Sequence, residues 1–131
     1  MKYLLDTDTL IDFIQDRGQT RARIAAMTEA GDLLALCAVT VAELYSGLSE
    51  KNLRLFNAWL QSLPYWHISR EAAMQAGSYR KTAAEAGRTL HVSDCLIATC
   101  AREQDAVVVT SNAKDFPMRD VRVLSLRDEA A

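Results

Sequence analysis

The sequence predicts an α/β protein in which a mostly parallel sheet is covered by helices on both faces. Short apolar runs alternate along the chain with segments of helical spacing, as expected of strand–helix–strand units. One of these runs, residues 33–38, is apolar at every position, which is typical of a strand buried on both faces. With 131 residues, the chain is expected to form a single domain, residues 1–131.

Apolar spacing and helix-ending residues define the elements of the first part of the chain. Leu10, Phe13 and Ile14 repeat at helical spacing. Gly18 is expected to end that helix, and Gly31 to cap the next one. The elements expected up to residue 48 are, in order, a strand at 3–5, helices at 9–15 and 21–30, a strand at 33–38 and a helix at 40–48.

Capping residues and β-branched runs define the remaining elements. Ser69 is expected to cap a long helix that stops at Gly87, and Ser93 is expected to cap a further helix. The valine run at 107–109 predicts a buried strand. The elements expected after residue 48 are, in order, a helix at 51–60, a strand at 65–68, helices at 70–86 and 94–103, and strands at 106–110 and 121–124.

Charge and cysteine content exclude several classes of protein. The net charge of −2 argues against a broad nucleic-acid-binding surface, because such domains are usually strongly basic. Cys37, Cys95 and Cys100 are odd in number and lack C-x-x-C spacing, so reduced thiols in a cytoplasmic protein are expected rather than disulfides or a zinc site. No charged-then-apolar leader and no apolar stretch of about 18 residues is present, so neither secretion nor membrane insertion is expected.

Four acidic residues lie where the backbone is expected to turn or to begin a helix: Asp6, Glu43, Asp94 and Asp115. Ligands of parallel sheets bind beyond the carboxyl ends of the strands, and Asp6 and Asp115 both follow such ends. Carboxylates that converge there repel one another unless a cation lies between them, and a hard divalent cation is the usual solution. The four acids therefore favour a metal-dependent enzyme.

Each of these acids also has a purely structural interpretation. Glu43 is three residues after Thr40 and could close a capping box, which taken alone is its better explanation. Asp94 could favour a helix N-terminus through the helix dipole, and Asp115 could stabilise a turn. The catalytic hypothesis depends on the joint occurrence of the acids, because the predicted fold contains a place where they could meet.

Four segments carry these acids: YLLDTDTLIDF, TVAELYSGL, SDCLIATCA and VVVTSNAKDF. In this order and spacing they resemble the four acidic motifs of PIN-domain ribonucleases, and most nearly those of the VapC toxins of type II toxin–antitoxin pairs. The resemblance spans nearly the whole chain. It implies a three-layer α/β/α sandwich with a central mostly parallel sheet, and a metal-dependent endoribonuclease that is the toxin of such a pair.

By this resemblance, the catalytic residues are Asp6, Glu43, Asp94 and Asp115. We expect Asp6, Asp94 and Asp115 to bind Mg²⁺ or Mn²⁺, as one ion or two, and Glu43 to bind through water or to orient the attacking water. Two ions about 4 Å apart can activate a water and support the leaving oxygen of a phosphodiester. The resemblance further implies products with a 5′-phosphate and a 3′-hydroxyl.

Polar residues beside the acids are expected to support them. Thr7 and Asn112 match polar positions of the family, and Ser111 and Asn112 could position a carboxylate or a phosphate by hydrogen bonds. Asp8 is a departure, since many relatives have Asn there. Its position favours a cap of the first helix over an additional carboxylate at the edge of the site.

The substrate implied by the resemblance is RNA. Arg80, Lys81 and Arg88 precede the SDCLIATCA segment and are candidate phosphate contacts. A solvated helix face explains each of these three residues at least as well. Both interpretations stay open at the level of sequence.

Two protein partners are implied by the same resemblance. One is a small cognate antitoxin, expected to lay an apolar segment against the first two helices and to block the site with a basic side chain. The other is a second copy of the chain in a homodimer. The helices around Tyr45, Leu48 and Leu55 are the candidate dimer surface.

Two other magnesium-binding families are alternatives. The segment LLDTDTL has the D-x-D pattern of haloacid-dehalogenase-like phosphatases, and VVVTSN resembles their Thr/Ser motif, but Leu10 stands where Thr or Val is usual. A receiver-like signalling module has a similar length and also gathers acids around Mg²⁺. It needs a phosphorylatable Asp after the third strand, where this chain has Ser69.

Overall fold

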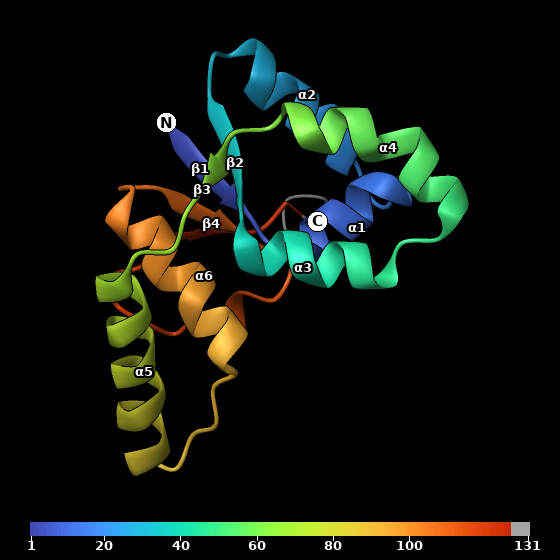
Figure 1. The fold of residues 1–131 in the computed structure, drawn as a ribbon. Helices are drawn as coiled ribbons and strands as arrows, with labels where there is room; N and C mark the ends of the chain where they lie inside the picture. The colour runs from blue at the N-terminus through green and yellow to red at the C-terminus, as the bar shows by residue number, and fades with distance from the viewer. Residues whose placement is uncertain (127–131) are drawn as a thin grey trace.

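The computed structural model describes residues 1–126, which contain five parallel strands in the order β3-β2-β1-β4-β5 (Figure 1). The strands are Lys2–Leu5 (β1), Leu33–Cys37 (β2), Tyr65–Trp66 (β3), Val107–Val109 (β4) and Val123–Leu124 (β5). Every strand pair is parallel. The predicted parallel sheet is confirmed, with β1 at its centre.

Successive residues of the inner strands are buried in two different clusters. In β1, Leu4 packs into one cluster and Leu5 into the other, and in β4 Val108 and Val109 divide in the same way. Side chains of a strand alternate between the two faces of a sheet, so each cluster marks one covered face. This explains why β2 and β4 are apolar at every position and why β1 ends in two leucines.

Helices cover both faces, as expected for a three-layer sandwich. The helices of the described residues are Thr7–Ile14 (α1), Thr20–Glu29 (α2), Ala38–Gly47 (α3), Glu50–Ser62 (α4), Arg70–Glu85 (α5) and Val92–Glu103 (α6), with a short 3₁₀ helix at Ala113–Asp115 (η1). Helices α5 and α6 pack on one cluster and α1 to α4 on the other, and Figure 1 shows the two groups on opposite sides of the sheet. None of the helices within residues 1–126 is long and apolar enough to cross a membrane.

Helix ends follow the predicted capping residues in α2 and α5. The Ser69 hydroxyl accepts a hydrogen bond from the Ala72 amide (3.0 Å) and so caps α5. Gly31 and Gly87 follow α2 and α5 with positive φ angles of 85° and 80°, a conformation that glycine adopts without strain.

Two strands are shorter than the sequence predicts. In β3 only residues 65–66 pair with β2, because the chain turns away through residues 67–68 to reach the cap of α5. In β5 only residues 123–124 pair with β4. Val121, predicted as strand, donates its amide to Met118 (3.2 Å) in a turn instead.

The strand order creates a switch point between β1 and β4. From β1 the chain builds outward through β2 to β3, and then returns to place β4 on the other side of β1. The crevice beyond the carboxyl ends of β1 and β4 is where such sheets bind ligands. Asp6 and Thr110 are the first residues after these two strands, and the Asp6 amide donates to the Val109 carbonyl (2.9 Å).

Candidate active site

Asp6 directly follows the central strand and caps α1. Its carboxylate accepts hydrogen bonds from the Thr7 amide (2.8 Å) and, through its other oxygen, from the Thr110 hydroxyl (2.8 Å). Only 7% of the residue is exposed. Burial, followed by the charge of Asp8, raises the pKa of Asp6 to about 7. Near neutral pH, Asp6 therefore changes readily between its charged and neutral forms.

The expectation that Asp8 caps the first helix is wrong. Asp6 takes that position, so Asp8 lies in the first turn of α1 and its side chain reaches the loop after β4. Its carboxylate accepts hydrogen bonds from the Ser111 hydroxyl (2.7 Å), the Ser111 amide (3.3 Å) and the Asn112 side-chain amide (2.6 Å). Ser111 and Asn112 thus position a carboxylate, as expected of them, and that carboxylate is Asp8.

The capping box expected between Thr40 and Glu43 does not form. Helix α3 begins at Ala38, and the Thr40 hydroxyl accepts a hydrogen bond from the Cys37 amide (3.1 Å). Glu43 lies about one turn further along α3, where its exposed carboxylate accepts a hydrogen bond from the Thr7 hydroxyl (2.8 Å). The Glu43 side chain is therefore attached to the start of α1, beside Asp6.

Asp94 lies in the first turn of α6, close to the positive end of the helix dipole. The helix begins at Val92, with His91 before it, so the predicted cap at Ser93 is wrong by two residues. Burial raises the pKa of Asp94 to about 6. Neighbouring acids raise it further, whereas the charge of His91 acts in the opposite direction.

The charges that act on Asp94 come from three other segments of the chain. Asp115 contributes most to raising its pKa after burial, and Glu43 and Asp8 contribute in the same direction. Asp115 is the last residue of η1 in the loop after β4, as the sequence predicts. The predicted acids therefore converge at the switch point, together with Asp8.

The cluster has the chemistry, but not the assembled ligand set, of a metal centre. Among residues 1–126, no ion pair involves any of its acids, and no group of three or more His, Cys, Asp or Glu side chains is placed to hold a metal directly. The expected ligands Asp6, Asp94 and Asp115 are thus near one another without forming a direct site. Their oxygens still suit Mg²⁺, which retains several waters and needs few direct carboxylates.

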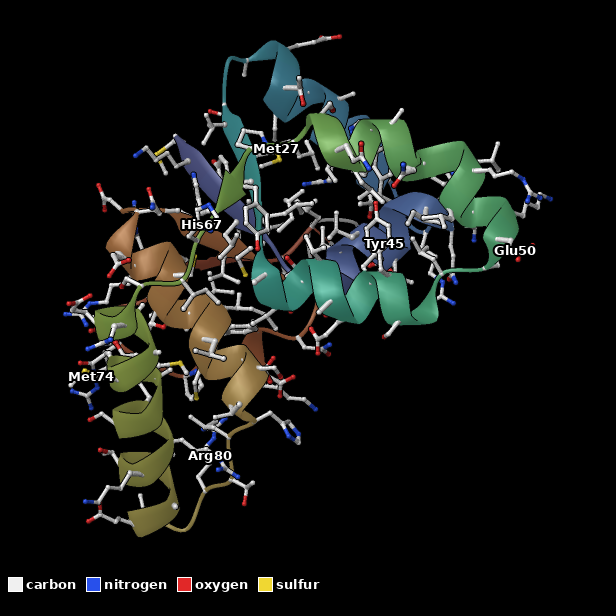
Figure 2. All side chains as sticks on the ribbon, viewed as in Figure 1. Met27, Tyr45, Glu50, His67, Met74 and Arg80 are labelled. Atoms are coloured by element: carbon white, nitrogen blue, oxygen red, sulfur yellow. The ribbon has the colours of Figure 1, made fainter. Side chains whose placement is uncertain are left out.

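A basic groove lies beside the acids. Arg80, Lys81 and Arg88 line a cavity of about 460 Å³ between α5 and the segment that leads to α6, where Figure 2 shows Arg80. Arg80 donates to the Leu90 carbonyl (3.2 Å), and Arg88 donates to the Lys114 carbonyl (2.5 Å), one residue before Asp115. The groove is therefore joined to the loop that carries Asp115.

Two buried threonines belong to the site, although the sequence did not indicate them. Thr110 is fully buried, and its oxygen accepts the Asn112 amide (3.1 Å) while its hydroxyl donates to Asp6. The Thr9 hydroxyl donates to the Val109 carbonyl (3.1 Å) and fixes α1 against β4. For Thr110, the available signal was a hydroxyl directly after the apolar run at 107–109, where a strand meets its loop.

Known proteins resemble this chain over nearly its whole length. The family pattern described as PIN domain matches residues 3–122. Ribonuclease VapC2 of Haemophilus influenzae is 26% identical over 134 residues, covering 98% of this chain and 97% of the relative. The tRNA(fMet)-specific endonuclease VapC of Shigella flexneri is 28% identical over 138 residues, covering 98% of this chain and 97% of that protein.

The fold is also found among solved structures. A chain in the DNA-bound VapBC structure from Salmonella typhimurium superimposes with a TM-score of 0.81 at 27% identity, covering 95% of this chain and 98% of that chain. The family match covers most of the chain, including all four acidic segments. This protein belongs to the PIN domain family.

Proposed function

We propose that this PIN domain is a divalent-metal-dependent endoribonuclease and the toxin of a toxin–antitoxin pair. The observation that carries the proposal is the convergence of Asp6, Glu43, Asp94 and Asp115 at the switch point, with no ion pair to neutralise them among residues 1–126. The names of the relatives, a ribonuclease and a tRNA endonuclease, support RNA phosphodiester hydrolysis as the reaction.

Asp6, Asp94 and Asp115 would hold Mg²⁺ or Mn²⁺, as one ion or two, partly through water. Such an ion supplies an activated water and stabilises negative charge on the phosphate. The raised pKa values of Asp6 and Asp94 mean that burial and repulsion oppose their charged forms. A bound cation relieves that repulsion, and protons compete with it for the same oxygens.

Glu43 is suited to orient the attacking water. The Thr7 hydroxyl bonds to one oxygen of its carboxylate (2.8 Å), which leaves the other oxygen to accept a proton from that water. The water oxygen bonds to phosphorus as the P–O3′ bond breaks, and the 3′ oxygen takes a proton from solvent. The products, a 5′-phosphate and a 3′-hydroxyl, are those that the family resemblance implies.

The basic groove is proposed to hold the RNA backbone. Arg80, Lys81 and Arg88 supply cationic donors beside the acids, and phosphate contacts of this kind position a nucleic acid without reading its sequence. A local basic groove reconciles RNA binding with a chain of net charge −2. The hydrogen bond from Arg88 to the Lys114 carbonyl supports a path of the RNA backbone past Asp115.

A small antitoxin is the proposed protein partner, as in the VapBC structure from Salmonella typhimurium. A small cavity of about 120 Å³ lies between α1 and α3, rather than between the first two helices where the antitoxin segment was expected, and it supports inhibition by an apolar anchor. It has apolar walls that include Ile11, Ile14 and Leu44, and Glu43 lies at its edge. An apolar antitoxin side chain would fill it while a neighbouring basic side chain pairs with the acids.

A homodimer is proposed through an apolar groove on the other side of α3. The groove has a volume of about 470 Å³, and its walls include Val41, Tyr45, Leu60 and Tyr65 (Figure 2 labels Tyr45). Tyr45 is 37% exposed and Leu55, on the neighbouring α4, is 63% exposed. Large apolar side chains left this exposed favour a protein contact.

The structure gives the two alternative families no support. A phosphatase of the haloacid-dehalogenase type needs Asp6 as an accessible nucleophile, yet only 7% of Asp6 is exposed and both its oxygens accept hydrogen bonds. A receiver-like module needs an Asp directly after the third strand. That position is His67.

The test is a cleavage assay with the purified chain, total cellular RNA and Mg²⁺, followed by sequencing of the 5′ ends of the fragments. We expect discrete cuts whose 5′ ends carry phosphate. The same preparation should not hydrolyse p-nitrophenyl phosphate. Turnover of p-nitrophenyl phosphate without any RNA cleavage would overturn the proposed function.

A further inference from the structure

We propose that Asp8 is a positioning residue that holds the loop after β4, residues 110–115, in its catalytic arrangement. The inference rests on the proposed nuclease function, because that function makes Asp115 in this loop a part of the active site. Asp8 acts through the backbone and side chains of the loop. It does not need to touch RNA or metal.

The two shortest hydrogen bonds to Asp8 come from consecutive loop residues, Ser111 and Asn112, whereas the Thr110 and Thr9 hydroxyls lie 3.2–3.5 Å from its oxygens. One carboxylate oxygen accepts the Ser111 hydroxyl (2.7 Å) and the Asn112 side-chain amide (2.6 Å), and the other accepts the Ser111 amide (3.3 Å). An ionised carboxylate has only acceptor sites, so it can satisfy all of these donors at once. Asp8 therefore binds this segment through its backbone and through both side chains.

Thr110 completes the attachment of the loop to the first motif. Its hydroxyl lies 2.8 Å from Asp6 and 3.2 Å or more from Asp8, so its single proton is best placed on Asp6. Three consecutive loop residues are thus held by two acids that are themselves two residues apart. These two acids are Asp6, which follows β1, and Asp8, in the first turn of α1.

Because Asp8 positions Asn112, it also affects the position of Asp115. The Asn112 carbonyl accepts the Asp115 amide (2.9 Å), so the residue that Asp8 fixes also begins the short helix that ends at Asp115. A displaced Asn112 would move Asp115 with it. Displacements of about 1 Å at a catalytic group can lower rates by about 100-fold.

An asparagine at position 8 would not satisfy the same donors. The Asn side chain has one acceptor oxygen and one NH₂ group, which is a donor. In one orientation the NH₂ group would face the Ser111 amide, and in the other it would face the Ser111 hydroxyl and the Asn112 side-chain amide. The hydrogen bonds that persist would also lose their charge assistance. A carboxylate therefore satisfies the donors of this loop better than an amide does.

The first test compares the steady-state kinetics of Asp8→Asn with those of the wild-type chain. We expect kcat to fall by about 10- to 100-fold, as is typical when an outer partner of a catalytic site is removed. KM should change by less than about twofold, because the proposed phosphate contacts lie in the basic groove. The matched control is Asp16→Asn, which removes one exposed acid near the end of α1, at a positive φ of 54° that Asn tolerates.

Exchanging the residues at positions 8 and 112 tests the hydrogen bond between Asp8 and Asn112. In the Asp8→Asn, Asn112→Asp double variant, the amide of residue 8 can donate to a carboxylate at residue 112, while its carbonyl still accepts from Ser111. Relative to the wild-type chain, we expect kcat of the double variant to be about fivefold or more higher than the product of the relative kcat values of the two single variants. Losses that simply multiply would show that the Asp8–Asn112 bond does not position the loop.

Hydrogen exchange of the protein without RNA gives a readout that does not depend on activity. Amides in residues 110–115 should exchange about 10-fold faster in Asp8→Asn, as expected when roughly one charge-assisted hydrogen bond is lost. Exchange elsewhere should match Asp16→Asn, which confirms that the fold is intact. If the wild-type chain cuts no RNA, the proposed function fails; if loop exchange and kcat are unchanged in Asp8→Asn, the inference about Asp8 fails.

Discussion

Two carboxylate centres of this protein differ in how their charge is balanced. Asp120 accepts a hydrogen bond from the Tyr79 hydroxyl (2.5 Å) and pairs with Arg102 of α6 (3.1 Å). Asp6 is buried, accepts hydrogen bonds from neutral groups, and has another acid, Asp8, as the charge that perturbs it most. A cationic side chain balances the charge of the first centre, whereas no ion pair formed within residues 1–126 balances that of the second.

The difference separates a structural acid from a functional one. Asp120 and its two partners connect α5, α6 and the loop before β5, so their contacts stabilise the packed fold. The acids around Asp6 repel one another, so their contacts oppose the fold unless a cation binds. Substitution at the two centres should therefore have opposite consequences for activity and for stability.

The largest expected effect is the loss of RNA cleavage at the acid cluster. Asp6→Asn and Asp94→Asn should each lower kcat/KM by on the order of 1,000-fold or more, because each removes a charge that the cation requires. Asp120→Asn should stay within about threefold of the wild-type chain, since its partners Tyr79 and Arg102 lie outside the site. Initial rates on one RNA substrate measure all three, and circular dichroism confirms folding. Comparable losses of kcat/KM at the acid cluster and at Asp120 would contradict the distinction between a functional and a structural centre.

The next effect is on the stability of the metal-free protein. The pKa of Asp6 is raised from 3.8 to about 7, so the folded state binds its proton more tightly than the unfolded state does. This contribution to the free energy of unfolding is present at low pH and is lost as the pH rises from about 4 to about 7.

Asp6→Asn should therefore raise the free energy of unfolding at pH 8 by about 1–3 kcal/mol, and by little at pH 4. Asn also retains the helix cap. Asp120→Asn should lower it by about 0.5–1 kcal/mol, because the lost ion pair is partly exposed. Urea titrations in EDTA provide the measurement. A destabilised Asp6→Asn at pH 8 would contradict the account of charge repulsion.

The third effect is the pH dependence of metal binding. Asp6 and Asp94 have pKa values of about 7 and about 6, so protons should compete with a divalent ion below these values. The apparent Mn²⁺ affinity should fall by about tenfold per pH unit between pH 7 and pH 6, where Asp6 takes up a proton, and by up to about 100-fold per unit below pH 6, where Asp94 takes up a second one. Calorimetric titration at pH 5, 6, 7 and 8 would reveal this, and a constant affinity over that range would be inconsistent with these ligands.

The smallest effect is expected in the basic groove. Lys81→Ala should raise KM by about 3- to 10-fold with little change in kcat. It should also reduce the slope of log RNA affinity against log salt concentration by the amount expected for roughly one phosphate contact. Lys51→Ala, on α4 outside the groove, is the charge-matched control. Equal effects of the two substitutions would show that the groove does not bind the backbone.

The sequence indicated which acids meet but not how the local backbone presents them. Asp6 and Asp115 could be predicted because strand ends of a parallel sheet share one edge, and Asp94 because its segment resembles a motif of the family. The role of Glu43 could not be separated from a capping box, since the start of α3 depends on where β2 leaves the sheet. The apolar run through Cys37 and Ala38 does not mark that point.

The contacts of Asp8 and Thr110 were beyond sequence reasoning for a different reason. They join residues about 100 positions apart, and they depend on the pairing of β1 with β4. A local pattern offered Asp8 the role of helix cap, but the cap belongs to Asp6. Local capping rules fail here because tertiary partners determine which side chain faces the helix start.

The most direct test of the central claim, that the acid cluster is a divalent-metal nuclease site, measures RNA cleavage against Mn²⁺ concentration after treatment with EDTA. For the wild-type chain we predict no cleavage in EDTA and a saturable rise as Mn²⁺ is restored. For Asp94→Asn we predict no rise over the same range. Cleavage that persists in EDTA, or an Asp94→Asn chain that reaches the wild-type rate, would contradict the claim.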